Sequence, residues 1–223
     1  MSFDLEDQIS LKVNEIFYSI QGESTYAGLP CVFVRLTGCN LRCSYCDTQY
    51  AYDEGNVMLL SDIITKVSSY KCPLVEITGG EPLIQEKTPL LVSHLLAEGY
   101  NVMMETNGSQ DISIIYERCS KIVDIKCPSS GEHESSDLKN LDRLGTSDEI
   151  KFVIAERDDY EYARNVLEQL NTEKMLKGRI HFSPVFGKIE PGLLGQWILD
   201  DHLDARLHIQ LHKIIWDSDK RGV

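Results

Sequence analysis

Three cysteines stand close together in the run Cys39–Cys46, at Cys39, Cys43 and Cys46. A structural zinc site usually closes with four ligands, commonly built from Cys-x-x-Cys pairs. Three thiolates on one short loop can instead hold three irons of a cubane 4Fe–4S cluster and leave the fourth iron open. An open iron can bind a small molecule through nitrogen and oxygen atoms. The spacing therefore predicts a 4Fe–4S cluster, and the alternative is a zinc site completed by a distant residue.

Two later segments carry groups that suit a ligand near such a loop. Gly79 and Gly80 follow an apolar run directly and precede Glu81. Glycine lets the backbone approach a ligand closely, and a carboxylate or carbonyl oxygen can accept from an ammonium group. Glu105 ends the next apolar run, where a buried carboxylate needs a partner. Both segments are therefore candidate ligand contacts, although each could also be an ordinary turn after a strand.

The cysteine spacing, with Tyr45 directly before the last cysteine, resembles the signature of the radical S-adenosylmethionine (SAM) superfamily. The Gly-Gly-Glu-Pro run resembles its second motif. The resemblance implies that the open iron chelates SAM and that one electron from the cluster releases a 5′-deoxyadenosyl radical. It also implies that Tyr45 lies near the adenine, that Gly79, Gly80 and Glu81 meet the amino group of SAM, and that Glu105 contacts its ribose or the substrate.

Further motifs resemble one family within this superfamily, the 7-carboxy-7-deazaguanine synthases. They are the run Asn14–Ser24, Arg35, Cys46–Thr48 and Gln210–Lys213, and together they extend from Val13 to Trp216. The chain departs from the family pattern at Ser24, where a glycine is expected, and in the tail Asp217–Val223. The resemblance thus covers nearly the whole chain in the order of the family's motifs.

The resemblance implies a specific reaction. The family uses SAM and Mg2+ to convert 6-carboxy-5,6,7,8-tetrahydropterin into 7-carboxy-7-deazaguanine with loss of ammonia, in 7-deazapurine (queuosine) biosynthesis. Its implied substrate-binding residues here are Ile20, Gln21, Glu23, Arg35 and His212, its magnesium ligand is Thr48, and its catalytic residues are Glu105 and His212. Ser129 and Ser183 are further expected contacts of SAM.

The residue types suit such a substrate. Amide and carboxylate groups such as Gln21 and Glu23 can read the donors and acceptors on a pterin edge. Arg35 offers a bidentate partner for a substrate carboxylate. Magnesium usually keeps waters and takes few protein ligands, so a single hydroxyl such as that of Thr48 is enough.

Strand-like and helix-like segments alternate along the chain. Strands are expected at Val13–Ile20, Cys31–Leu36, Leu74–Thr78, Asn101–Glu105, Ile122–Lys126, Glu149–Ile154, Ile180–Phe182 and Leu207–Leu211. Helices are expected at Asp62–Tyr70 with Ser61 as N-cap, Thr88–Glu98, Ile112–Arg118, Asp158–Leu170 and Leu193–Leu203, and the loosest stretch at Lys126–Ser147. Repeated strand-then-helix units imply a parallel sheet of the α/β class. About six units are too few for an eightfold barrel, so the resemblance implies an open partial (β/α)6 barrel with its site at the carboxyl ends of the strands.

The length, net charge and apolar content of the chain limit the kinds of partner that it can bind. The 223 residues suit one radical SAM domain, with a net charge of −13 and no apolar run long enough to span a membrane. The acidic start Met1–Asp7 lacks a signal-peptide pattern, so a cytoplasmic protein is expected. The net negative charge predicts that the protein binds neither nucleic acid nor an anionic membrane. Cys31, Cys72, Cys119 and Cys127 are expected to be buried apolar residues.

The family resemblance implies a homodimer and an electron donor such as flavodoxin or ferredoxin. Two other functions stay open. A glycyl-radical-enzyme activase would share the cysteine spacing and act on a protein partner, and a non-catalytic module would hold zinc.

Overall fold

Nine strands form one sheet in the part of the chain that the computed structural model describes, residues 9–169, 178–218 and 220–223. They are β1 (Ser10–Ile20), β2 (Pro30–Leu36), β3 (Asn56–Leu59), β4 (Leu74–Gly79), β5 (Asn101–Thr106), β6 (Ser120–Ile125), β7 (Glu149–Ile154), β8 (Ile180–Pro184) and β9 (Arg206–Leu207). The order across the sheet is β3-β1-β2-β4-β5-β6-β7-β8-β9. Neighbours from β2 to β9 are parallel, whereas β1 is antiparallel to both β2 and β3.

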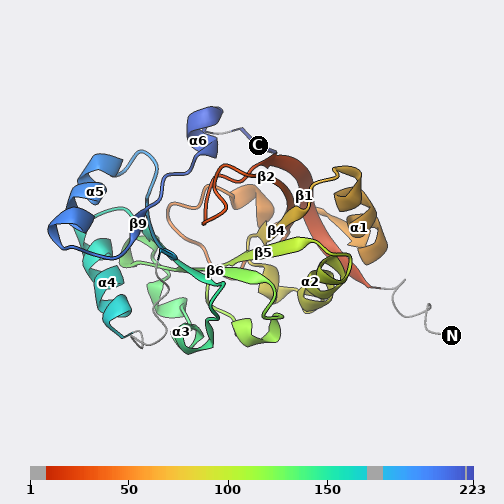
Figure 1. Cartoon of the computed structure of the whole chain (residues 1–223), viewed down its shortest axis with the longest axis horizontal. Helices are drawn as coiled ribbons and strands as arrows, with labels where there is room; N and C mark the ends of the chain where they lie inside the picture. The colour runs from red at the N-terminus through yellow and green to blue at the C-terminus, as the bar shows by residue number, and fades with distance from the viewer. Residues whose placement is uncertain (1–8, 170–177, 219) are drawn as a thin grey trace.

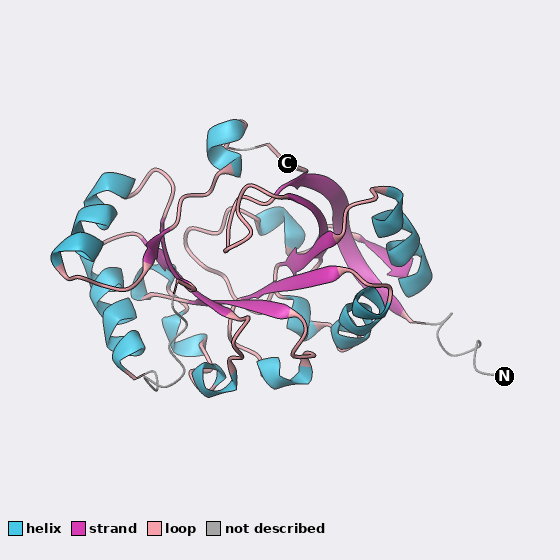
Figure 2. Ribbon diagram, viewed as in Figure 1, coloured by secondary structure: helices cyan, strands magenta, loops and turns pink. Residues whose placement is uncertain are grey.

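Helices cover the outer face of this sheet (Figures 1 and 2). They are α1 (Leu60–Ser69), α2 (Thr88–Ala97), α3 (Asn140–Arg143), α4 (Arg157–Glu168) and α5 (Pro191–Asp200), whereas α6 (His212–Ile215) stands apart from them at the top of Figure 1. The strands β2 and β4 to β8 form the expected partial barrel, and the first hairpin and β9 extend it at its two edges. In Figure 1 the C-terminal end of the chain returns to lie near β2.

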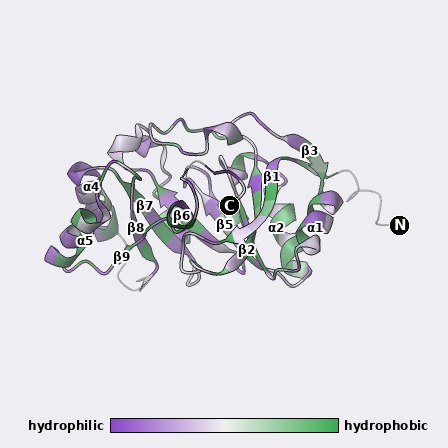
Figure 3. Ribbon diagram, turned by 90° about the horizontal axis from the view of Figure 1, so that it is seen from above, coloured by the Kyte–Doolittle hydropathy of each residue, from purple (hydrophilic) through white to green (hydrophobic). Residues whose placement is uncertain are grey.

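Alternation along the central strands separates an apolar outer face from a polar inner face. In β4, the fully buried Val75 and Ile77 point to one face of the sheet, and Glu76 between them points to the other face. In β7, Ile150 and Phe152 flank Lys151 in the same way and are also fully buried. Figure 3 shows hydrophobic stretches along the strands and hydrophilic residues on the outer helix α4. Packing of the outer face supplies the core, and the inner face is left for polar chemistry.

Three local expectations were wrong. The segment Ile112–Arg118 forms only a 3-10 turn at Ile112–Ile114, because the buried Ile112 and Ile115 are spaced for a single turn between two strands. The strand expected at Leu207–Leu211 is only Arg206–Leu207 long, since the chain then turns inward and Leu211 donates its N–H to the carbonyl of Gly22. Helix α1 follows β3 without a loop, so Leu59 and not Ser61 is its N-cap. The stretch Lys126–Ser147, which was expected to be the loosest, contains only short turns and the four-residue α3 with its buried Asn140.

Two expectations extend beyond the described residues. Leu170, at the end of the expected amphipathic helix, and the acidic start Met1–Asp7 both lie outside them. Within the described residues, no helix is long and apolar enough to cross a bilayer.

A buried ion pair at the amino ends of β6 and β7 generates a stability prediction. Asp148 is fully buried, 3.1 Å from the ammonium of Lys121, and accepts N–H groups from Lys121 and Gly145. Asp148→Ala would leave a buried cation unpaired, which costs about 3–5 kcal/mol, or a drop of roughly 10 °C in Tm for a chain of this size. Differential scanning fluorimetry measures the shift.

The matched control is Glu161→Ala, which breaks the exposed pair that Glu161 forms with Arg157 on α4. That change should cost less than about 1 kcal/mol. Equal shifts for the two variants would contradict the assignment of Asp148 as the counter-charge of Lys121.

Candidate active site

A cavity of about 740 Å³ opens at the carboxyl ends of the parallel strands and continues down their inner face. Most residues expected to bind cofactor or substrate line it. They are Ile20, Gln21, Glu23, Arg35, Cys39, Cys43, Tyr45, Cys46, Thr48, Gly79, Gly80, Glu105, Ser183 and His212. Glu81 and Ser129 do not belong to its lining. Residues spread over most of the sequence therefore share one space.

The cysteine loop follows β2 and lies at one end of the cavity. Its three thiols are free and partly buried. The backbone N–H of Leu41 donates to Cys39 Sγ at 3.4 Å, and the Asn107 amide approaches the same sulfur at 3.8 Å. Burial raises the pKa of the Cys43 thiol to about 11. Three sulfur ligands with amide donors beside one of them are a set that fits a cubane cluster.

Glycine is required where the second motif meets this loop. A Cβ on Gly80 would lie 2.2 Å from the carbonyl oxygen of Gly38 and 2.6 Å from Cys39 Cβ. No side chain can enter that space, so only glycine allows the end of β4 to pack against the first cysteine. The exposed backbone of Gly79 and Gly80 then faces the cavity.

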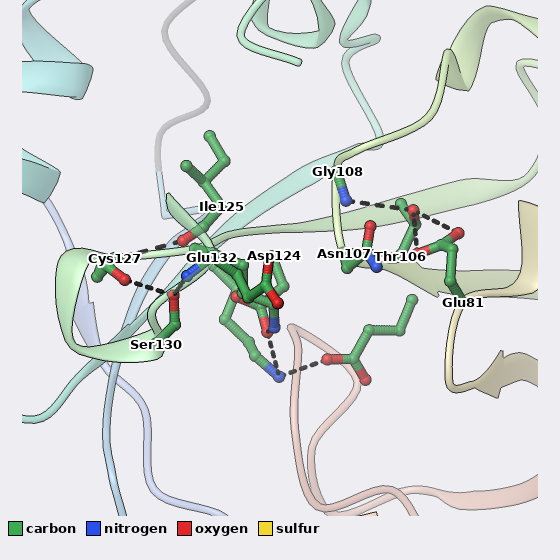
Figure 4. A network of polar contacts seen from close by, with 12 residues as sticks. Glu81, Thr106, Asn107, Gly108, Asp124, Ile125, Cys127, Ser130 and Glu132 are labelled. Carbon is green, nitrogen blue, oxygen red and sulfur yellow. Dashed lines mark hydrogen bonds and ion pairs between the residues drawn. The ribbon is translucent and has the colours of Figure 1, made fainter. Parts of the chain in front are cut away.

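Glu81 supports the site from behind instead of facing the cavity. Its fully buried carboxylate accepts the N–H of Asn107 at 2.6 Å, the N–H of Leu83 at 2.9 Å and the hydroxyl of Thr106 at 2.9 Å. Figure 4 shows Glu81 reaching from the end of β4 to Thr106 and Asn107. These bonds use the groups that were expected to meet SAM. The Glu81 carboxylate therefore positions the segment after β5, and its contact with SAM stays a prediction.

Ser129 also lies beneath the cysteine loop. Its carbonyl accepts the Ser44 hydroxyl at 2.6 Å, and its own hydroxyl donates to Glu156 at 2.8 Å. Ser183 does line the cavity, but its hydroxyl donates to the carbonyl of His208 at 3.0 Å. Ser129 thus supports the loop between the cysteines, and contacts of Ser129 and Ser183 with SAM stay predictions.

Lys151 occupies the centre of the polar inner face. Its buried ammonium donates to Glu23 at 2.6 Å and to Glu105, and lies 3.9 Å from Asp124. Burial opposes the charge, but Glu105 and Glu23 outweigh it and raise the pKa of Lys151 well above its usual value. Burial would also raise the pKa of Glu23, yet Lys151 and the Gln210 amide hold it well below its usual range. Lys151 therefore keeps the candidate substrate contact Glu23 ionised and fixed.

The turn between β1 and β2 carries Gln21 and Glu23 across the open side of the barrel. Thr25 donates both its N–H, at 3.0 Å, and its hydroxyl to the buried carboxylate of Glu149 on β7. Ser24 has φ 63°, the left-handed conformation that explains why the family pattern places glycine there. The Ser24 hydroxyl accepts the N–H of Tyr26 at 3.1 Å, which helps serine to serve in the turn.

Arg35 on β2 and His212 at the start of α6 line the same cavity. Arg35 donates from Nε to Glu15 at 2.8 Å, which leaves the rest of its guanidinium for a ligand. His212 begins α6, and its ring occupies the space beside Gly22, where a Cβ would lie 2.3 Å from Nδ1. Burial lowers the pKa of His212 below its usual value. The neutral imidazole then has one N–H donor and one acceptor.

The expected magnesium ligand Thr48 lies at the rim of the cavity beside Asp47. The Thr48 hydroxyl donates to Asp47 at 3.0 Å, and Asp47 pairs with Lys213 at 2.6 Å. The same pair ties α6 to the residue after the last cysteine. Thr48 as a magnesium ligand stays a prediction.

Sequence analysis missed four polar residues of the inner face. Glu76, Asp124 and Lys151 line the cavity, and His181 lies deeper, 2.7 Å from Glu149. Burial and then Glu105 raise the pKa of Glu76 to about 8. The available signal was a single polar residue between apolar neighbours in an otherwise buried strand, as in Val75-Glu76-Ile77. Such a residue points away from the helices and into the barrel.

A partial (β/α)6 barrel with a three-cysteine loop beyond its first strand, β2, defines a radical SAM protein. The model of the radical SAM superfamily matches residues 33–129 of the chain. The crystal structure of QueE from Escherichia coli superimposes with a TM-score of 0.76 over 92% of this chain and 98% of that chain, at 22% identity, and so supports the fold.

Two curated relatives identify the family within the radical SAM superfamily. A 7-carboxy-7-deazaguanine synthase of Koribacter versatilis is 44% identical over 96% of this chain and 100% of its own length. One of Chlorobaculum tepidum is 43% identical over 98% of this chain and 100% of its own length. The chain belongs to the 7-carboxy-7-deazaguanine synthase family, whose members are radical SAM lyases.

The central ammonium leads to the first prediction about activity. Lys151→Met removes the shared cation, so Glu23 and Glu105 would face each other without compensation. We expect kcat/KM for the substrate to fall by about 100-fold or more. Iron and sulfide per chain should stay at the wild-type level, because Lys151 has no hydrogen bond to the cysteine loop. Steady-state kinetics under anaerobic conditions, together with iron analysis, measures both.

Lys139→Met is the matched control, since Lys139 is an exposed lysine next to α3. It should retain wild-type kinetics. A Lys151→Met enzyme with normal kcat/KM would show that Glu23 and Glu105 need no cation between them.

Proposed function

We propose that this chain is a radical SAM lyase that converts 6-carboxy-5,6,7,8-tetrahydropterin into 7-carboxy-7-deazaguanine with loss of ammonia, for 7-deazapurine or queuosine biosynthesis. One observation carries the proposal. The cysteine loop and the side chains suited to a pterin and its carboxylate, namely Gln21, Glu23, Arg35 and His212, line one cavity. The names of the relatives give the same product.

In this proposal Cys39, Cys43 and Cys46 hold a 4Fe–4S cluster. When bound, the cluster and SAM supply a radical that can abstract hydrogen from the substrate. The backbone of Gly79 and Gly80 would bind SAM, with Tyr45, Ser183 and Glu105 beside it. Support comes from the lining of the cavity, which includes all of these residues.

The remaining residues would bind and orient the pterin. Arg35 suits its carboxylate, since Glu15 takes only the Nε side of the guanidinium. Gln21 and Glu23 would read the ring edge, and the backbone of Ile20 would lie beside it. Glu105 and His212 are the proposed catalytic residues, which hold or move protons at the substrate. Thr48 would give Mg2+ its protein ligand, and Asp47 lies within reach of the waters that the ion retains.

The assembly is proposed on the family resemblance. Residues 1–223 would form a single radical SAM domain that pairs as a homodimer in the cytoplasm. An electron donor such as flavodoxin or ferredoxin would reduce the cluster, and neither nucleic acid nor a membrane would be a partner.

The decisive experiment is an anaerobic incubation of the reconstituted protein with SAM, dithionite, Mg2+ and 6-carboxytetrahydropterin, followed by mass spectrometry. We expect 7-carboxy-7-deazaguanine together with 5′-deoxyadenosine. Formation of 5′-deoxyadenosine without the deazapurine would retain the radical SAM chemistry and favour an activase that acts on a protein partner. Zinc without iron or sulfide after anaerobic purification would instead indicate a metal-binding module.

Substitution of Arg35 tests binding of the pterin separately from binding of SAM and of the cluster. Arg35→Lys keeps the charge but loses the fork that can pair with a carboxylate and with Glu15 together. We expect KM for the pterin to rise by about 10- to 100-fold, which corresponds to the loss of one charged hydrogen-bonded pair. KM for SAM and the iron content should not change.

The matched control is Arg118→Lys, an exposed arginine before β6. It should leave both KM values unchanged. An Arg35→Lys enzyme with an unchanged KM for the pterin would remove Arg35 from the proposed binding site.

A further inference from the structure

Glu76 is a buried acid with no assigned role. It lies in the middle of β4 between the fully buried Val75 and Ile77, so its side chain points to the inner face of the barrel. Only 5% of the residue is exposed, and it lines the cavity. Among the described residues its carboxyl group accepts one hydrogen bond, from Nε2 of Gln21. A buried carboxyl group with a single partner beside a ligand cavity has capacity left for the ligand.

The partner of Glu76 is a residue proposed to read the pterin. Gln21 is nearly fully buried, and its Oε1 accepts the N–H of Glu23 at 2.9 Å. Because Nε2 donates to Glu76 at the other end, both ends of the Gln21 amide are held. Glu76 thus decides which way the Gln21 amide faces, and only one Nε2 hydrogen remains free for a ligand.

Within the described residues Glu76 forms no ion pair, although the nearby Lys151 acts to lower its pKa. The charged and titratable groups around it are Glu105 on β5, Glu23 in the β1–β2 turn, Lys151 on β7, and Arg35 and Cys31 on β2. The Lys151 ammonium is bonded to Glu23 and Glu105, and Arg35 is bonded to Glu15. Burial and the charge of Glu105 therefore raise the pKa of Glu76 to about 8. At neutral pH the group is a carboxylic acid, with one O–H donor and one acceptor oxygen.

We propose that Glu76 is a further substrate-binding residue, whose protonated oxygen donates to an acceptor atom of the pterin while its other oxygen holds the Gln21 amide. The inference rests on the proposed function and adds the group that meets an acceptor on the ring. Ring nitrogens and the ring carbonyl of a pterin are such acceptors. Glu23, which Lys151 keeps ionised, can only accept, so the two carboxyl groups in one cavity recognise opposite parts of the ring edge.

Two variants separate this role from a structural one. Glu76→Gln keeps the shape, accepts from Gln21 through Oε1 and offers an N–H in place of the O–H. We expect its KM for the pterin to stay within about threefold of wild type at pH 7. Glu76→Leu removes both hydrogen bonds, and its KM for the pterin should rise by about 10- to 100-fold, with KM for SAM unchanged. Glu117→Gln, at an exposed position before β6, is the control.

The pH dependence of kcat/KM distinguishes the two roles of Glu76 more directly than KM at a single pH. In the wild type, kcat/KM for the pterin should fall as pH rises through about 8, because ionised Glu76 can no longer donate. Glu76→Gln cannot ionise, so this alkaline limb should disappear. An unchanged limb in Glu76→Gln, or an unchanged KM for the pterin in Glu76→Leu, would overturn the proposal.

Thermal stability tests the protonation state without turnover. The usual pKa of 4.5 is raised to about 8 in the fold, so folded Glu76 keeps a proton that the unfolded chain loses between those values. Wild-type stability therefore falls with rising pH across that window relative to Glu76→Gln. From pH 5 to 8 the Tm of the wild type should fall relative to the Tm of Glu76→Gln. A constant Tm difference between the two proteins would contradict a neutral Glu76.

Failure of the proposed function would look different. If the wild-type enzyme neither binds the pterin in calorimetry nor converts it, the proposed substrate is wrong and the role of Glu76 falls with it. If the wild type turns over and the Glu76 variants keep its KM and pH profile, the function stands and only the Glu76 assignment fails.

Discussion

The site depends on one buried ammonium. Lys151 holds Glu23 from the β1–β2 turn and Glu105 from β5, and Asp124 of β6 lies 3.9 Å away. Without a cation, carboxylates in this space would repel one another or take up protons. Lys151 therefore sets the charge state of the inner face, and within the described residues Glu76 forms no ion pair with it. One lysine on β7 thus links the position and the ionisation of residues far apart in the sequence.

The same region closes the open barrel. Six parallel strands with a short seventh cannot surround a site, so other segments must cover the gap. The β1–β2 turn crosses to β7, where Glu149 accepts from Thr25, and it meets the segment before α6, where Leu211 donates to Gly22. Lys213 then ties α6 to Asp47 at the end of the cysteine loop. Side chains from both ends of the chain are in this way brought to one cavity.

Stability and chemistry are divided between the two faces of the sheet. The outer face buries apolar side chains such as Ile77 and Phe152 against helices, and this burial is the main favourable contribution to folding. The inner face buries charges, which is costly unless each is paired or hydrogen-bonded. Period-two alternation in β4 and β7 permits both in one strand, because neighbouring residues face opposite sides.

The sequence by itself determined the cysteine loop, the second motif, the alternation of strands and helices, and the family, since these depend on local spacing and residue type. It also identified most of the expected site residues that line the cavity, because carboxyl ends of parallel strands meet at one edge. It missed Glu76 and Lys151, and it did not show that the Glu81 carboxylate binds Thr106 and Asn107. Only the tertiary structure shows the partners of these side chains. A charged residue in an apolar strand is paired by residues of other strands, which are distant in the sequence and become neighbours only in the folded sheet. The antiparallel first hairpin, the short β9 and the turn at Ile112–Ile114 were likewise set by packing, which local propensity does not contain.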